Sequence, residues 1–411
     1  MKIAVVVQRY GNEVVGGAET HSRKIAEKLK EQLNWTIEIV TTTAVDYRTW
    51  HNYFPEGTAE VNGISVHRFP NVFSRWKFFN VIHRLTCRYQ PSLERRRWLQ
   101  WATPLLEKLW YVAQGPYSPK LIEFLRRQES KYDAILFFTY LYHPTVAGIQ
   151  VNPSKSILIP EAHDEPPFYF RGTKSTVATA RYILTNTDAE SRLITVIEPE
   201  ARVKIVRAGM GIDLAKDLPS ESFNAKIDGL GRYVLYMGRV DHSKLVHVLI
   251  ENFLNFVTLD KESTIKLILA GGKDPNLVIP DHPQIQYLGF VTEAEKILLI
   301  KRSRGMINPS AFESLSIIVA EAMALGVPVL VNGFSEVLRD YQLLAKSVFV
   351  YNNPEEFRMR ISRMIKFGSS EVDREQLDLG RSAIDDLFNW NNIVKTYETK
   401  VRSIVSTSEP S

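Results

Sequence analysis

The stretch "GMINPSAFESLSIIVAEAMALGVPVLVNG", residues 305–333, contains the signals of a strand, a helix and a second strand. The apolar run at 305–310 ends in Asn-Pro-Ser, and the run at 327–333 ends in Asn-Gly. The apolar segment between them is long enough for a helix. A helix that joins two short apolar strands is typical of a parallel β-sheet. The stretch therefore predicts an α/β fold.

The same alternation continues along the chain of 411 residues. Several apolar runs are almost continuously hydrophobic, as strands covered on both faces should be, and they predict doubly wound parallel sheets. Strands are expected at 2–7, 36–42, 64–69, 134–140, 156–160, 182–185 and 203–206, and then at 233–238, 265–272, 285–290, 305–310, 327–333 and 347–351. Helices are expected at 18–31, 246–259, 292–302 and 391–404.

The alternation is interrupted once, by a segment at 208–232 that is rich in Gly, Asp and Ser. Weak periodicity and this composition predict a linker. Because the α/β pattern then restarts, we expect two Rossmann-like domains that face each other across a cleft. The predicted domains are 1–207 and 208–388. A last segment, 389–411, forms a helix that could pack on either domain.

Composition favours a folded, soluble protein, since 45% of the residues are hydrophobic and 24% are charged. The only cysteine, Cys87, excludes an internal disulfide and a thiolate zinc cluster, and this cysteine usage favours a cytoplasmic setting. The N-terminal apolar run is short and predicts a strand, not a secretion signal. No apolar segment reaches the length of about 20 residues that a membrane-spanning helix needs.

Positive charge is concentrated at 68–110, an insertion that extends over about 70–118. This segment has nine Lys/Arg and two Asp/Glu, hence +7, whereas the whole chain has +5. It also contains Trp76, Trp98, Trp101 and Trp110. Basic residues among aromatics can bind an anionic membrane surface, at the inner face of the membrane, or a lipid-linked acceptor. The alternative is a solvated basic helix face with inward aromatics. No nucleic-acid-binding motif supports a third interpretation.

Glycines and cations follow two of the predicted strands, at the sheet edge where ligands of parallel sheets bind. Gly16 and Gly17 precede the first helix and would let an anion approach its N-terminus, although a plain tight turn is the alternative. Arg239 and Lys244 follow the strand at 233–238. Two cations there can neutralise a diphosphate; the alternative is a pair of solvated surface cations.

Two glutamates belong to the central helical segment, one at its start and one inside it. Glu313 stands where strand gives way to helix, and Ser314 and Ser316 suit a helix start. Glu321 lies among apolar residues, where an unpaired carboxylate would be costly. Ribose hydroxyls are one suitable partner, and an Arg or a backbone N–H is the alternative. A sugar, a diphosphate and a ribose along this segment would fit one nucleotide-sugar.

His163 follows the strand at 156–160, within "PEAHDEPPFY" (160–169). Its ring can hydrogen-bond a substrate hydroxyl or a leaving-group oxygen, and a structural role is the alternative. The adjacent His163, Asp164 and Glu165 do not have the spacing of a metal site.

These motifs together resemble the retaining glycosyltransferases of family 4, which have the GT-B fold. "VLYMGRVDHSK" (234–244) looks like the phosphate-binding motif of that family. "ESLSIIVAE" (313–321) fits its E-x7-E signature, with "EAMALGVPVL" (321–330) as the usual continuation. Shorter matches extend the resemblance over most of the chain: "GGAE" (16–19), "AHD" (162–164), "GMGID" (209–213) and "LFNWNN" (387–392).

The resemblance implies a retaining hexosyltransferase that needs neither a metal nor a cofactor. The donor would be a UDP-, GDP- or dTDP-sugar, and the acceptor a glycan or a lipid-linked compound of polysaccharide or glycolipid biosynthesis. The first domain would lie on the acceptor side and the second would bind the donor, and the last helix would cross back to the first domain. The diphosphate would be held by two cations, two glycines and two backbone N–H groups: Arg239, Lys244, Gly16, Gly17, Leu315 and Ser316.

The remaining roles also come from the resemblance. Glu313 would contact the transferred sugar, and His163 would lie near it at the reaction centre. Glu321 would bind the ribose, while Phe290 and Val291 would lie against the base. This chain departs from the common pattern at Ser314, Leu315 and Leu245, where the family often has glycine, an aromatic residue and glycine. Two other functions share the architecture: a nucleotide-sugar 2-epimerase and a catalytically silent binding protein.

Overall fold

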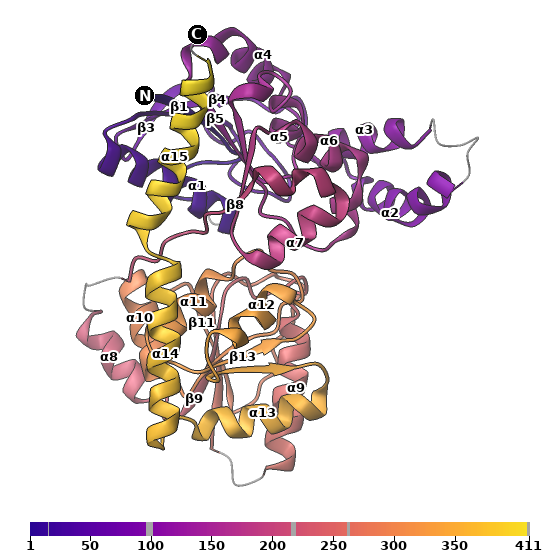
Figure 1. Cartoon of the computed structure of the whole chain (residues 1–411). Helices are drawn as coiled ribbons and strands as arrows, with labels where there is room; N and C mark the ends of the chain where they lie inside the picture. Colours follow the sequence, from indigo (N-terminus) through magenta and orange to yellow (C-terminus); the bar gives the residue numbers. More distant parts are fainter. Residues whose placement is uncertain (15, 96–101, 215–218, 261–263, 409–411) are drawn as a thin grey trace. The chain divides into compact units, whose positions relative to one another are not determined.

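The computed structural model describes the chain except residues 15, 96–101, 215–218, 261–263 and 409–411 (Figure 1). The chain forms two compact units, Met1–Met210 with Trp390–Ser411 and Gly211–Asn389. The sequence predicted domain boundaries at 207/208 and 388/389, and the two units of the structure meet at 210/211 and 389/390. Each unit is an α/β structure around its own largely parallel sheet, as predicted.

The first unit is built on an eight-stranded sheet of order β3-β4-β2-β1-β5-β6-β7-β8, parallel except between β3 and β4. Its strands are β1 (Lys2–Val6), β2 (Thr36–Thr42), β3 (Gly57–Val61), β4 (Ile64–Phe69), β5 (Ala134–Phe138), β6 (Ser156–Ile159), β7 (Tyr182–Thr185) and β8 (Ile205–Arg207). Its helices are α1 (Gly17–Leu33), α2 (Phe79–Arg95), α3 (Ala102–Gln114), α4 (Pro119–Gln128), α5 (His143–Gly148), α6 (Arg171–Thr179), α7 (Asp188–Ile197) and α15 (Trp390–Ser408).

The sequence analysis missed β3, which forms a hairpin with β4 at the edge of the sheet. Asn62 and Gly63 join the two strands, both with left-handed φ values, 51° and 73°. Asn-Gly is the preferred pair for such a two-residue turn, so the signal was present. The strand itself is almost fully exposed and lacks the apolar pattern that reveals the other strands.

The second unit has a six-stranded parallel sheet of order β11-β10-β9-β12-β13-β14. Its strands are β9 (Tyr233–Met237), β10 (Lys266–Ala270), β11 (Ile285–Gly289), β12 (Met306–Asn308), β13 (Val329–Asn332) and β14 (Val348–Tyr351). Its helices are α8 (Glu221–Asp228), α9 (Val246–Leu259), α10 (Glu293–Arg302), α11 (Ile317–Ala324), α12 (Glu336–Asp340), α13 (Pro354–Lys366) and α14 (Glu371–Leu387). The predicted linker was partly wrong, because α8 lies inside 208–232, capped by the Ser220 hydroxyl.

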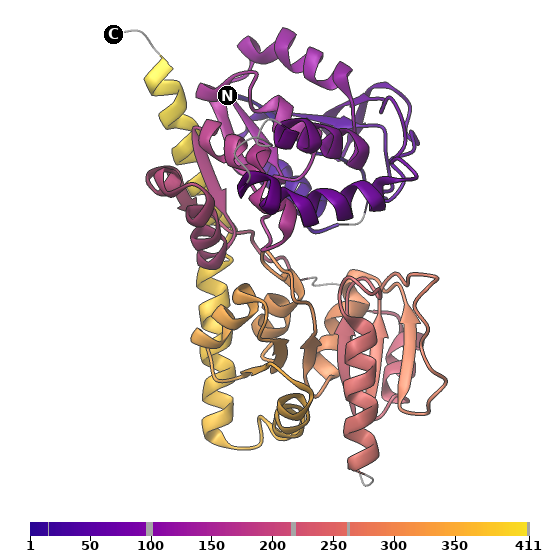
Figure 2. The same ribbon diagram turned by 90° about the vertical axis from the view of Figure 1, so that its right-hand side faces the viewer.

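Helices cover both faces of the second sheet (Figure 2). One face packs on α9 and α13 in a single apolar core that includes Phe253, Ile361 and Leu330. From the central strand β9 the chain first builds one side of the sheet and then returns to build the other from β12. The strand order thus reverses between β9 and β12, which is where open α/β sheets bind ligands.

The last helix, α15, packs within the first unit. The Lys28 ammonium of α1 lies 6.0 Å from the centre of the Trp390 ring at the start of α15. Near its other end, the hydroxyl of Ser403 hydrogen-bonds the Tyr182 hydroxyl of β7 at 3.0 Å. Among the described helices, none is both long and apolar enough to cross a membrane.

The helices α2 and α3 form a hairpin that extends from the first unit (Figure 1). Trp110 is buried with Phe79 against Phe170. Trp76 and Phe78, in contrast, are 39% and 74% exposed. Some aromatic residues of the basic segment are therefore packed inward and others are exposed, so each of the two expected arrangements holds for part of the segment. The predicted Trp98 and Trp101 lie outside the described residues.

Candidate active site

The loop after β9 carries both predicted cations, and a buried aspartate organises it. Asp241 is 4% exposed. One of its carboxylate oxygens accepts hydrogen bonds from the Lys244 N–H at 2.9 Å and from the Ser243 hydroxyl at 2.7 Å. Its other oxygen lies 3.5 Å from the Arg239 guanidinium. Sequence analysis missed Asp241, although an aspartate that accepts a hydrogen bond from a backbone N–H a few residues later is a recognisable turn motif.

Leu245, at a position where the resembled family often has glycine, adopts a left-handed backbone conformation. Its φ and ψ are 56° and 30°, directly before α9. A non-glycine residue in this left-handed region costs about 1–2 kcal/mol. The turn beside Lys244 therefore holds some backbone strain.

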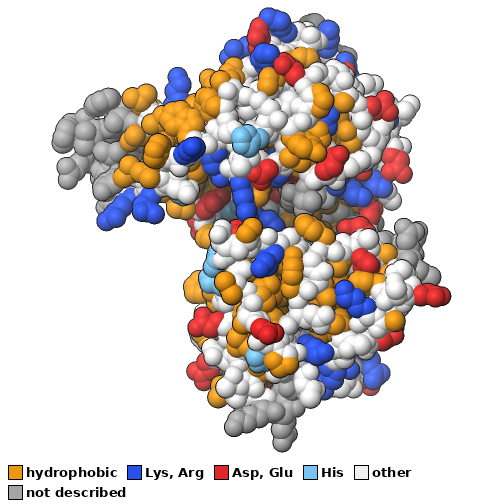
Figure 3. All heavy atoms as spheres, turned by 180° about the vertical axis from the view of Figure 1, so that it is seen from behind, with side chains coloured by type: hydrophobic (Ala, Val, Ile, Leu, Met, Phe, Trp, Pro, Cys, Tyr) orange, Lys and Arg blue, Asp and Glu red, His pale blue; other side chains and the backbone are white. Residues whose placement is uncertain are grey.

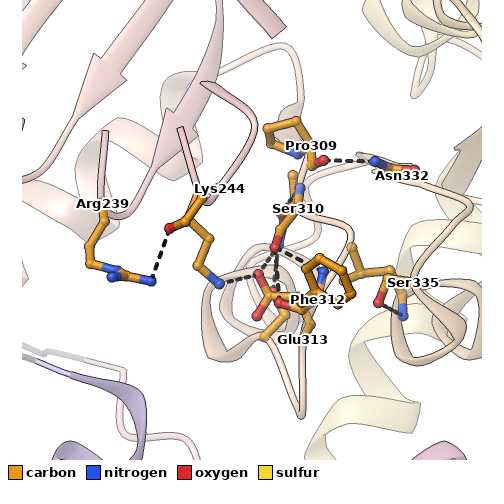
Figure 4. Close-up of polar contacts among 12 residues, drawn as sticks. Arg239, Lys244, Pro309, Ser310, Phe312, Glu313, Asn332 and Ser335 are labelled. Atoms are coloured by element: carbon orange, nitrogen blue, oxygen red, sulfur yellow. Dashed lines mark hydrogen bonds and ion pairs between the residues drawn. The ribbon is translucent and has the colours of Figure 1, made fainter. Parts of the chain in front are cut away.

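Lys244 reaches across to Glu313, which follows the neighbouring strand β12 (Figure 4). Their ammonium and carboxylate groups are 2.8 Å apart, with side chains 24% and 13% exposed. The Asn308 amide lies 3.4 Å from the same carboxylate oxygen and donates to the Ser316 hydroxyl at 2.8 Å. Asn308, the last residue of β12, was also missed by the sequence analysis.

The helix after Glu313 begins later than expected. Ser316 has a left-handed φ of 61°, so α11 begins at Ile317 and Ser316 is its N-cap. Ser316 thus stands at the helix start, as its residue type indicated, and the N–H groups of Leu315 and Ser316 that the resemblance assigns to the diphosphate precede the first helical turn. Both residues belong to the preceding loop, where the Leu315 carbonyl accepts a hydrogen bond from the Tyr341 hydroxyl at 2.7 Å.

Glu321 is buried, 5% exposed, and it has a protein partner. The Lys296 ammonium of α10 lies 2.7 Å from its carboxylate. Burial raises the pKa of Glu321, and the positive charge of Lys296 opposes that shift. The sequence predicted that this carboxylate must have a partner but did not identify Lys296, because the two residues are 25 positions apart.

Phe290 and Val291 follow β11, as expected for residues at a strand end. Phe290 is 74% exposed, an unusual state for a large aromatic side chain. Its ring packs beside Gly272, where an added Cβ would come within 2.8 Å of the ring. An exposed ring beside the loop that follows β10 can offer one face to a flat ligand.

In the first unit, Gly16 and Gly17 begin α1 and differ in their surroundings. A Cβ on Gly16 would come within 2.0 Å of the Glu19 carboxylate, whereas a Cβ on Gly17 would meet nothing within 4 Å. Glu19 is buried and accepts hydrogen bonds from Arg9 and Gln8, both at 2.8 Å. Gly16 is therefore explained by internal packing, while Gly17 faces open space.

This difference gives a prediction for the two glycines. Gly16→Ala should destabilise the protein by about 3 kcal/mol, because the new methyl group must displace a buried carboxylate from its guanidinium. Gly17→Ala should leave the unfolding free energy nearly unchanged. Urea unfolding of the two variants measures both effects. Equal loss of stability in both variants would contradict the prediction.

His163 lies in a loop that buried carboxylates hold. The N–H of Ala162 donates to Glu190 at 2.6 Å, and Glu161, in the left-handed region at φ 50°, lies 2.6 Å from the His21 ring nitrogen. Burial, with the nearby Glu161 charge, raises the pKa of Glu190 to about 8. His163 is thus placed beyond the carboxyl end of β6 by a fixed backbone.

The structure brings Lys244 and Glu313 into direct contact and places Arg239 on the same loop as Lys244. Leu315, Ser316 and Glu321 follow Glu313 along one segment of the second unit. Gly16, Gly17 and His163 belong to the first unit, at the ends of β1 and β6.

Known proteins were compared by family, by sequence and by structure, and the three comparisons agree with one another. Residues 231–366 match the family described as glycosyl transferases group 1. The chain is 21% identical to an uncharacterized glycosyltransferase of Methanocaldococcus jannaschii, over 96% of each chain. The structure of sucrose-phosphate synthase from Thermosynechococcus elongatus is similar with a TM-score of 0.71 and 16% identity, over 99% of this chain and 100% of that one.

A second similar structure is HepE of Anabaena in complex with UDP-glucose, with a TM-score of 0.65 and 14% identity, over 98% of this chain and 100% of that one. The similar folds, which cover almost the whole chain, confirm the predicted GT-B fold. The chain therefore has the two-domain fold of the GT-B glycosyltransferases, and its residues 231–366 match the group 1 glycosyltransferases.

Proposed function

We propose that this chain is a retaining glycosyltransferase of family 4, which transfers a hexose from a nucleotide-diphosphate sugar to a glycan or a lipid-linked acceptor. The observation that carries the proposal is the contact between Lys244 and Glu313 at the point where the order of the second sheet reverses. A cation for phosphate and a carboxylate for sugar hydroxyls are side by side there. The match of residues 231–366 to group 1 glycosyltransferases supports it.

The donor would bind with its diphosphate at Arg239 and Lys244. Both cations neutralise the charge that grows on the diphosphate as its bond to the sugar breaks. Lys244 would then exchange Glu313 for a phosphate oxygen, and the released carboxylate would accept hydrogen bonds from sugar hydroxyls. Because these cations stabilise the leaving group, the proposal needs no metal ion.

Retention of configuration follows from attack on the same face. The acceptor oxygen bonds to the anomeric carbon on the side from which the diphosphate departs, and the acceptor proton passes to the departing diphosphate oxygen. His163 would lie beside the sugar and accept or donate a hydrogen bond there. No second carboxylate at glycosidase spacing is required.

A thermal-shift panel tests donor binding first. UDP, GDP, dTDP and their sugars are added with and without EDTA, since a ligand at 100 times its Kd stabilises by about 2.7 kcal/mol. The nucleotide-sugar that stabilises the protein is then incubated with candidate acceptors, and NMR of the product reports the anomeric configuration. We expect retention and activity in EDTA. An inverted product would refute the retaining mechanism.

The same assays separate the two alternatives. A 2-epimerase would convert the donor without an acceptor, and a silent binding protein would be stabilised by a donor that it never turns over. HepE, a structural neighbour, binds UDP-glucose, which makes UDP-glucose the first donor to test.

We also propose that the α2–α3 hairpin is the part of the first unit that contacts an anionic membrane, where a lipid-linked acceptor would lie. Exposed apolar side chains lie along it: Trp76, Phe78, Val81, Leu85, Leu105 and Leu109. Exposed cations accompany them: Lys77, Arg84, Arg88 and Lys108. Figure 3 shows hydrophobic and basic side chains gathered on this part of the molecule.

The acid Glu107 does not oppose this charge, since it is 3% exposed. It accepts hydrogen bonds from the Arg171 and Gly172 N–H groups, both at 3.0 Å, and so ties α3 to α6. The outer surface of the described hairpin residues is thus apolar and cationic, a combination that favours an anionic bilayer.

The membrane proposal predicts that Phe78→Ser/Leu105→Ser lowers binding to mixed phosphatidylcholine–phosphatidylglycerol vesicles about 100-fold, because each of the two buried apolar side chains contributes about 1.5 kcal/mol or more. Co-sedimentation measures it. Phe334→Ser/Leu343→Ser, equally exposed in the second unit, is the matched control and should bind normally. Equal binding by both double variants, or no preference for anionic vesicles, would refute the proposal.

A further inference from the structure

Lys296 is a largely buried cation that the proposed chemistry has not yet used. It lies in the first two turns of α10, and its side chain is 14% exposed. Its ammonium group is 2.7 Å from Glu321 and 2.6 Å from Glu293. Glu293 is largely exposed, at 72%, so Glu321 is the partner with which Lys296 shares the protein interior.

A buried ion pair needs a reason, because both charges lose their hydration and apolar residues of the same volume are often as stable. Burial by itself would lower the pKa of Lys296, but the carboxylates of Glu321 and Glu293 raise it overall. Burial raises the pKa of Glu321 while Lys296 opposes that change. The carboxylates more than offset the effect of burial on the pKa of Lys296, whereas Lys296 only partly offsets it for Glu321, whose pKa remains raised.

We propose that Lys296 is a positioning residue for the donor ribose, which acts by holding the Glu321 carboxylate ionised and fixed in orientation. This inference rests on the proposed function, in which Glu321 receives the ribose. Lys296 occupies one carboxylate oxygen, Oε1. An ionised carboxylate has about four acceptor positions, so the other oxygen can still accept from ribose hydroxyls.

The position of Lys296 in the chain strengthens the inference. Residues 290–291, where the base would lie, directly precede the capped start of α10 at Thr292. The Thr292 hydroxyl and the Glu295 side chain form a reciprocal capping box, which fixes the first turn of α10. The ion pair thus joins the rigid helix start on the base side to the carboxylate on the ribose side.

A test follows from the different strength of hydrogen bonds to charged and neutral groups. Calorimetry compares UDP and GDP with their 2′-deoxy forms on the whole chain. The wild type should bind the preferred ribonucleotide about tenfold more tightly than its 2′-deoxy form, since a hydrogen bond to a carboxylate is lost. Lys296→Gln should reduce this preference to about twofold, and Lys296→Arg should keep most of it.

The pH dependence is a second readout, which a purely structural role would not change. As pH falls, Glu321 binds a proton and the ribose preference should weaken. Without the ammonium of Lys296 the carboxylate takes up its proton at higher pH, so the preference of Lys296→Gln should disappear at higher pH than that of the wild type. Lys301→Gln, an exposed lysine of the same helix, is the matched control and should behave as the wild type.

Comparing Glu321→Gln with the Lys296→Gln/Glu321→Gln double variant, in which the ion pair is replaced by two neutral side chains, keeps the inference testable if Lys296→Gln alone fails to fold. If Lys296 acts through Glu321, adding Lys296→Gln to Glu321→Gln should not change the ribose preference further. A further loss in the double variant would show that Lys296 contacts the nucleotide itself and would overturn the inference. So would an unchanged preference in Lys296→Gln at every pH. A wild type that binds no nucleoside diphosphate would refute the proposed function and this inference together.

Discussion

Lys244→Ala is expected to lower the rate of sugar transfer by about 10²–10³-fold while the protein remains folded. The ammonium group lies on the loop after β9, 2.8 Å from Glu313, at the position proposed for the donor diphosphate. Its charge is needed most when the bond to the sugar breaks, because a further negative charge then develops on the diphosphate. The measurement is kcat/KM for the nucleotide-sugar identified by thermal shift.

Controls separate loss of charge from loss of structure. Lys366→Ala removes an exposed lysine from the end of α13 and should leave activity unchanged. Lys244→Arg keeps a positive charge but not the compact ammonium, so it should retain part of the activity. Asp241 fixes the Lys244 backbone, and an unchanged melting temperature of Lys244→Ala would show that the loop persists. Full activity of Lys244→Ala would refute the assignment of the diphosphate site.

The strands of both sheets could be predicted because their signals are local. A strand buried on both faces must be apolar along its length, and β1, β5, β9 and β10 are apolar runs of this kind. The edge strand β3 was not predicted, because its residues are exposed and therefore lack an apolar pattern. The start of α11 was not predicted, because the left-handed backbone conformation of Ser316, with φ 61°, results from its surroundings and not from the preference of serine.

The sequence predicted which residues would form the candidate site, but not every residue that each of them contacts. Arg239, Lys244 and Glu313 follow strands that meet at one edge, so their proximity could be inferred from topology. The pair Lys296–Glu321 could not, since it depends on how α10 packs beside α11. Asn308 escaped for the same reason, because its contacts become visible only when the loop around Glu313 is folded.

Glu313→Gln is expected to separate donor turnover from nucleotide binding. In the free protein Glu313 competes with phosphate for Lys244, because their groups are 2.8 Å apart. A partly exposed ion pair contributes about 1 kcal/mol, so removing the carboxylate should tighten binding of the nucleoside diphosphate about fivefold. Transfer should fall about 10²-fold, since hydrogen bonds from sugar hydroxyls to a carboxylate are lost.

The opposite signs of the two effects make the experiment decisive. Calorimetry with the nucleoside diphosphate and initial rates with the nucleotide-sugar are measured on the same preparation. Glu355→Gln, an exposed glutamate in the first turn of α13, controls for a general change in charge. If Glu313→Gln weakened nucleotide binding and transfer equally, Glu313 would serve only to hold Lys244 in place. If it left transfer unchanged, the sugar would lie elsewhere, because a carboxylate that contacts the reacting sugar cannot be neutralised without a loss of rate.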